Sequence, residues 1–121
     1  MASRWYTVVI DAQDVRRLAD FWKQALDWQV VYEAAEEIVI AKDENTYPWL
    51  IFGTVPENKS VKNRLHIDLN PDDQQAEVER LLGLGATRVE VGQSAAKEPV
   101  KWVVLADPEG NEFCVLTARE Q

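Results

Sequence analysis

Apolar and polar residues recur with two different periods along this chain, and these periods predict its elements. Stretches with a two-residue period, or short runs rich in β-branched and aromatic residues, predict strands. Stretches whose apolar residues recur every three to four positions predict helices. The predicted strands are residues 5–11, 28–34, 36–41, 48–55, 63–69, 87–91, 100–106 and 112–117, and the predicted helices are residues 14–26 and 72–84.

The order of one strand, one helix and three strands occurs twice, with a period of about 58 residues. Module 1 covers about residues 1–57 and module 2 about residues 62–121, and the polar segment "VPENKSVKN" (55–63) is predicted to be a solvated loop between them. Neither half alone can bury both its sheet and its helix. We therefore expect a single α+β domain, in which two βαβββ modules pair into a curved, half-open mixed sheet barrel with the helices outside. Pairing within one chain and swapping between two chains both remain open.

Polar residues and glycine mark the ends of the two helices. Asp14 is the predicted N-cap of the first helix, and Asp27 is expected to end it in the left-handed region. Asn70 is the predicted N-cap of the second helix, with Pro71 at its first helical position. Gly85 is well placed to end that helix.

Charge and cysteine content exclude several classes of partner and location. The formal net charge is −8, so nucleic acid and anionic membrane surfaces are disfavoured as partners. One cysteine, Cys114, allows no intramolecular disulfide. No apolar stretch reaches the length of a membrane span, and the N-terminus lacks the features of a signal peptide. We expect a cytoplasmic protein, and general base rates favour a homodimer.

The only histidine, His66, lies in the alternating stretch "LHIDL" (65–69). Histidine is a common ligand of catalytic metals and a common general base. It can also line a pocket or pack within a strand. Five tryptophans are many for 121 residues, and they supply either core volume or the aromatic walls of a pocket.

Three segments give the chain a resemblance to a known family. They are "DVRRLADFWKQALDW" after the first strand, "VPENKSVKNRLHIDL" at the module junction and "DPEGNEFCVL" at the end. Together with the repeat, they resemble the vicinal oxygen chelate superfamily, which includes glyoxalase I, bleomycin-resistance proteins and extradiol dioxygenases. The last two segments resemble a bacterial subgroup of glyoxalase-like domains. This resemblance implies the paired βαβββ fold, but it does not name a reaction.

The resemblance also permits a position-by-position test for a metal. Metal-dependent members hold an ion with four inward-facing strand positions, which correspond here to Thr7, about Gly53, His66 and Cys114. Only His66 is an ordinary ligand, and Cys114 could bind as a thiolate. A catalytic ion needs at least three protein ligands, so this comparison favours no catalytic metal.

Two less favoured chemistries remain open around His66. Asp68 and Glu112 could form a shifted site for a divalent metal ion with His66, because each lies on a suitable strand face. Alternatively, Cys114, His66 and Asp68 could form a nucleophilic group. A cysteine in the middle of a strand has no free backbone donors for an oxyanion, which argues against this second chemistry.

Strand alternation predicts the lining of a concave, tryptophan-rich cleft. The predicted ligand-binding residues are Trp5, Thr7, Trp49, Ile51, His66, Trp102, Val104 and Cys114. The competing interpretation is that the tryptophans simply fill the interior. We expect a glyoxalase-like protein that binds a small hydrophobic or aromatic molecule without a metal. The alternative is a metal-dependent lyase, isomerase or dioxygenase with a degenerate site around His66, so whether the chain is an enzyme stays open and no catalytic residue is assigned.

Overall fold

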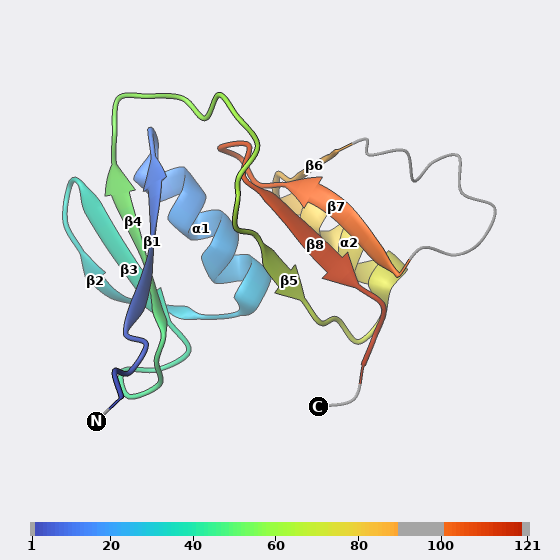
Figure 1. Cartoon of the computed structure of the whole chain (residues 1–121), viewed down its shortest axis with the longest axis horizontal. Helices are drawn as coiled ribbons and strands as arrows, with labels where there is room; N and C mark the ends of the chain where they lie inside the picture. The colour runs from blue at the N-terminus through green and yellow to red at the C-terminus, as the bar shows by residue number, and fades with distance from the viewer. Residues whose placement is uncertain (1, 90–100, 120–121) are drawn as a thin grey trace. The chain divides into compact units, whose positions relative to one another are not determined.

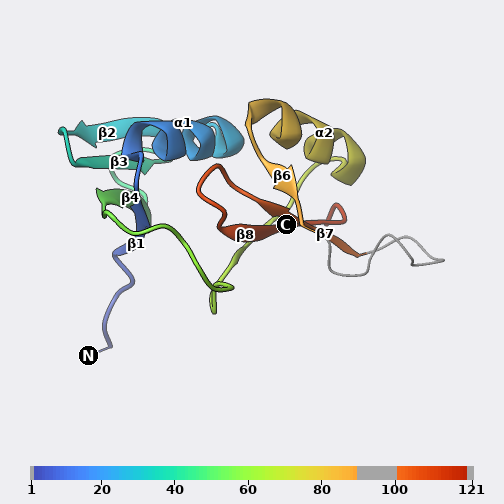
Figure 2. The same ribbon diagram turned by 90° about the horizontal axis from the view of Figure 1, so that it is seen from above.

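The computed structural model describes residues 2–89 and 101–119 (Figures 1 and 2). These residues divide into two compact units, one within 1–58 and one within 59–121. The strands form two four-stranded sheets, one in each unit. In Figure 2 each helix lies on one face of the sheet of its own unit.

The first unit contains one helix and a mixed sheet. Its elements are β1 (Thr7–Ala12), α1 (Val15–Leu26), β2 (Gln29–Glu33), β3 (Glu37–Ala41) and β4 (Trp49–Thr54). The strand order is β1-β4-β3-β2, with β1 parallel to β4 and the other neighbours antiparallel. Because β1 and β4 are parallel, the chain between them must cross over, and it does so through α1 and the β2–β3 hairpin.

The apolar face of α1 forms the core of the first unit. Val15, Leu18 and Trp22 are buried, as the helical spacing predicted. They pack against β1, β3 and β4, whose residues on that face include Ile40 and Phe52, both fully buried.

Both predicted ends of α1 are confirmed. Asp14 accepts a hydrogen bond from the backbone N–H of Arg17, which satisfies one of the free donors of the first turn. Asp27 adopts the left-handed region, with φ 55°. Its backbone N–H and that of Trp28 then donate to carbonyls of the last turn.

The second unit repeats this order of elements. They are β5 (Ile67–Leu69), α2 (Gln74–Leu84), β6 (Thr87–Arg88), β7 (Trp102–Ala106) and β8 (Glu112–Leu116). The strand order is β5-β8-β7-β6, with β5 parallel to β8 and the other neighbours antiparallel. Helix α2 packs on β8 with Val78 and Leu81 buried. Strand β8 is therefore central, with a hydrogen-bonded neighbour on each side.

The predicted start of the second helix is wrong. Asp73 is the N-cap, because its side chain accepts a hydrogen bond from the N–H of Ala76, and Pro71 precedes the helix. Asn70 has another role: its side chain exchanges two hydrogen bonds with the backbone of Arg119, at 2.9 and 3.0 Å. The predicted end at Gly85 is confirmed, with φ 123°.

Strand β5 begins at Ile67, four residues later than predicted. The backbone N–H and the side chain of Asn63 donate to the side chains of Glu112 and Asn111, so this residue is held by side chains and not by a strand ladder. The predicted strand 87–91 is observed at Thr87–Arg88, and residues 90, 91 and 100 of the predicted strands lie outside the described residues.

The α+β class and the two βαβββ modules are confirmed, but the described strands form two sheets and do not close into a barrel. The pairing of the modules into one curved sheet stays a prediction. Neither α1 nor α2, the helices in the described part of the chain, is long and apolar enough to cross a membrane.

Candidate functional site

One face of the second unit's sheet carries most of the residues with functional chemistry. Side chains alternate between the two faces of a strand. On β8, Phe113 and Val115 are buried, and α2 packs on this strand. Cys114 therefore points to the opposite face, where its register partners are Asp68 on β5 and Val104 on β7.

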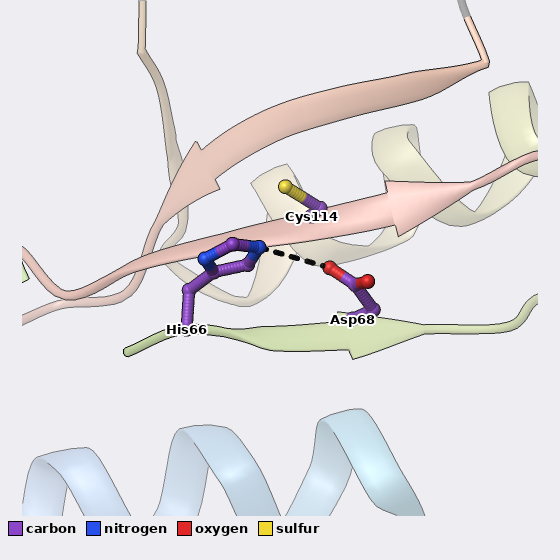
Figure 3. A group of neighbouring side chains, drawn as sticks. All are labelled: His66, Asp68 and Cys114. Carbon is purple, nitrogen blue, oxygen red and sulfur yellow. Dashed lines mark ion pairs between the residues drawn. The ribbon is translucent and has the colours of Figure 1, made fainter. Parts of the chain in front are cut away.

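His66, Asp68 and Cys114 come together on this face (Figure 3). His66 directly precedes β5 and lies two residues from Asp68, so the two side chains share a face. The imidazole Nε2 lies 3.2 Å from Oδ1 of Asp68. One ligand atom from each of the three side chains can be chosen so that all lie within 4.8 Å of one another. His66 and Asp68 are exposed, whereas Cys114 is buried.

The Cys114 thiol is held in its neutral form. Burial raises the pKa of this thiol, and the charge of Asp68 and a hydrogen bond with it raise the pKa further. The positive charge of Lys62 acts in the opposite direction. Because the thiolate is the nucleophile, and because β8 has ladder partners on both sides, the geometry argues against Cys114 as a nucleophile.

Glu112 lies on the same strand face but is engaged by other groups. Lys59 Nζ lies 3.0 Å from its Oε1, and the backbone N–H of Asn63 donates to its Oε2 at 3.3 Å. Burial alone would raise the pKa of Glu112, but hydrogen bonds from Lys59 and from backbone N–H groups, with the charge of Lys59, lower it overall. Glu112 is thus a carboxylate with a cationic partner. Among the described residues, the group that could hold a metal ion consists of His66, Asp68 and Cys114, and it does not include Glu112.

These side chains border an open pocket of about 790 Å³. Trp102, Val104 and Leu116 give it an apolar floor. The described residues that line it are Lys62, His66, Asp68, Val89, Trp102, Val104, Glu112, Cys114, Leu116 and Arg119. Four of the predicted ligand-binding residues, His66, Trp102, Val104 and Cys114, are therefore brought together in one pocket.

Sequence reasoning missed Lys62, Val89 and Arg119 as lining residues. Lys62 lies in the connector and Arg119 follows the last strand, so no strand periodicity applies to either. Arg119 is held beside the sheet by hydrogen bonds with Asn70, 49 residues away, and no local pattern in the sequence indicates this contact.

The other four predicted residues belong to the first unit. Thr7 of β1 pairs with Trp49 of β4. Ile51 of β4 pairs with Val9 of β1 and with Val39 of β3, on the sheet face opposite to the one that α1 covers. Trp5 precedes β1 and is exposed. Trp49 stacks on Tyr47, with ring centroids 4.7 Å apart. A ligand-binding role for Trp5, Thr7, Trp49 and Ile51 stays a prediction.

Comparison with known proteins points to one family. A model of the glyoxalase-like domain matches residues 7–116. Among solved structures, a glyoxalase/bleomycin resistance protein/dioxygenase family enzyme from Burkholderia phytofirmans PsJN is 19% identical, with 90% of this chain and 94% of that chain covered and a TM-score of 0.66. No curated protein matches the chain.

Resistance proteins share the same architecture. The fosfomycin resistance protein FosX from Mesorhizobium loti is 17% identical, with 98% of this chain and 94% of that chain covered and a TM-score of 0.69. The bleomycin resistance determinant encoded on the transposon Tn5 is 16% identical, with 98% and 100% covered and a TM-score of 0.61. At these identities the similarity shows the fold alone.

Proposed function

Because this chain belongs to the glyoxalase-like domain family, as its resemblance to the vicinal oxygen chelate superfamily predicted, we propose that it binds a small apolar or aromatic molecule, without a catalytic metal, in the pocket on the second unit's sheet. The observation that carries the proposal is the composition of the lining. An apolar floor of Trp102, Val104 and Leu116 adjoins the polar groups of His66 and Asp68. Ligand pockets commonly combine an apolar wall with a few polar groups that set orientation.

The exposure of Trp102 supports a binding role over core packing. Trp102 is 48% exposed, although it lies in strand β7 and pairs with the half-buried Leu116 of β8. A large aromatic ring that borders a pocket offers a flat contact surface to a ligand. Cys114, neutral and buried at the pocket floor, extends the weakly polar part of that surface.

Filling the pocket is expected to abolish binding. Val104→Trp would place an indole on the pocket floor, and we expect the affinity for 2-naphthylmethanol, measured by calorimetry, to fall by at least about tenfold because the lost contacts exceed about 1.4 kcal/mol. Val61→Trp is the matched control, because Val61 is exposed and lies outside the described pocket lining. Equal affinities of the wild type and Val104→Trp would contradict binding at this face.

A metal-dependent activity is the second candidate function, and the cluster of His66, Asp68 and Cys114 favours it. Three donors around one point are the minimum for a catalytic ion with an open position. The set fits a zinc-type ion through imidazole, carboxylate and thiolate, although it is not the superfamily's set of four positions, where Thr7 and Gly53 supply no strong donor. A bound ion would act as a Lewis acid in the pocket.

Metal titration distinguishes the two candidate functions. If the second candidate holds, zinc, nickel or manganese binds the wild type at micromolar affinity or better in calorimetry, and His66→Ala and Cys114→Ser lose it. Because the Cys114 pKa is raised, zinc binding must displace the thiol proton and weakens as the pH falls. Loss of binding in Glu112→Gln instead would indicate a site of His66 and Glu112. Absence of binding for all three metals would contradict the metal-dependent candidate.

Other parts of the proposal rest on the sequence alone. A homodimer, a cytoplasmic location and a single domain made of both modules stay predictions.

A further inference from the structure

The charge around the pocket differs from the net charge of the whole chain. The formal net charge of the protein is −8. At the pocket, however, Lys59 offsets the charge of Glu112 through the 3.0 Å ion pair. Lys62 and Arg119 then outnumber Asp68, the remaining lining carboxylate, even with His66 neutral. The described lining residues carry two cations and two carboxylates, and Lys59, which pairs with Glu112 from outside the lining, gives the pocket region one positive charge in excess in a strongly acidic protein.

The two cations belong to opposite ends of the sheet face. The N–H of Asn63 donates to Glu112 at the start of β8, which places the neighbouring Lys62 near that end. Arg119 follows the end of β8, and its backbone is fixed by Asn70, directly after β5. Of the two acidic side chains of the lining, Glu112 lies at the start of β8, whereas Asp68 lies in the middle of the sheet face, opposite Cys114.

Arg119 is the better-placed cation for an anion. Two hydrogen bonds, at 2.9 and 3.0 Å, hold its backbone, so less freedom is lost when its side chain binds. None of the ion pairs between described residues includes its guanidinium. A guanidinium matches a carboxylate in a bidentate geometry. The apolar residues of the same end are Trp102 and Leu116, which are paired across β7 and β8.

We propose that the ligand of this pocket is an organic anion, whose flat apolar part lies against Trp102, Val104 and Leu116 and whose acidic group binds Arg119. The proposal rests on the proposed function, because it names the class of molecule that the same pocket takes. Lys62 contributes a weaker, longer-range attraction from the other end of the sheet face.

The test compares three probes with one ring system and different charges: 2-naphthoate, 2-naphthylmethanol and 2-naphthylmethylammonium. We expect the wild type to bind the carboxylate about twofold to fivefold more tightly than the alcohol, since an exposed charge contact contributes up to about 1 kcal/mol, or about a fivefold change in affinity. The ammonium probe should bind most weakly. Added salt should reduce the advantage of the carboxylate and leave the alcohol unchanged.

Three variants assign the charge preference to a residue. Arg119→Gln should remove the preference for the carboxylate and leave the affinity for the alcohol unchanged, and Arg119→Lys should keep part of it. Lys62→Gln should have a smaller effect. Lys42→Gln is the control, because it makes the same change in net charge at an exposed residue of the first unit.

The outcomes separate this inference from the proposed function. If the alcohol binds and Val104→Trp abolishes its binding, but the carboxylate has no advantage or Lys62→Gln alone removes it, the pocket function stands and the Arg119 assignment is wrong. If no probe binds at millimolar concentration, both proposals are overturned.

Discussion

Trp22→Ala is expected to lower the free energy of unfolding by about 3–5 kcal/mol. The side chain is 1% exposed and lies between α1 and the sheet of the first unit, where its ring meets Phe21 edge-on with centroids 5.3 Å apart. Alanine removes most of the buried apolar area and leaves a cavity that the fixed helix cannot close. Urea denaturation followed by far-UV circular dichroism measures the loss.

Trp5→Ala is the matched control for this prediction. Trp5 is 68% exposed and precedes β1, so the same chemical change should cost under about 1 kcal/mol. Similar losses in the two variants would show that the buried face of α1 is assigned incorrectly. A loss of 3–5 kcal/mol is a large part of the stability of a small protein, so Trp22→Ala should be measured at low temperature.

Asp107→Ala is expected to lower the free energy of unfolding by about 2–4 kcal/mol. Among the described residues, Asp107 is the only buried charged side chain, with 3% exposure. Its Oδ1 accepts hydrogen bonds from the backbone N–H groups of Glu109 and Asn111, and both carboxylate oxygens accept from the Asn111 side chain. Alanine leaves these donors without their acceptor inside the β7–β8 turn. Urea denaturation again measures the effect.

Asp107→Asn separates the hydrogen bonds from the packing of this turn. Asparagine keeps one oxygen for the two backbone donors and loses the acceptor that faces the Asn111 amide, so about half of the destabilisation is expected. The turn also orients Asn111 and Glu112, which hold Asn63 and Lys59. A decrease in the free energy of unfolding of less than about 1 kcal/mol in Asp107→Ala would indicate that water molecules accept the hydrogen bonds of these donors. The turn would then not depend on this carboxylate.

The sequence predicted those parts of the fold that periodicity and helix capping determine. Buried positions such as Trp22 and Leu81 follow directly from helical spacing, and the repeat of one strand, one helix and three strands gave the two modules. The start of the second helix was predicted wrongly because Asn70 and Asp73 are both good caps. Which of them caps the helix depends on Arg119, which lies 49 residues further along the chain.

The part of the candidate site that depends on the alternation of side chains along single strands could be predicted from the sequence. Alternation placed His66 and Asp68 on one face and identified Cys114, Trp102 and Val104 as inward residues. The ion pair between Lys59 and Glu112 joins residues 53 positions apart, in a loop without periodicity. The role of Glu112 therefore could not be read from its own strand.

The alternation along β8 has a consequence for how this protein can change over generations. Phe113 and Val115 lie on the face that packs on the helix, whereas Glu112, Cys114 and Leu116 face the pocket. Point mutations at the second set alter what the pocket accepts and leave the packing that holds the sheet intact. A lineage with this scaffold can therefore change a metal ligand, a thiol or a charge at the pocket one residue at a time, while the face of β8 that packs on the helix keeps its residues.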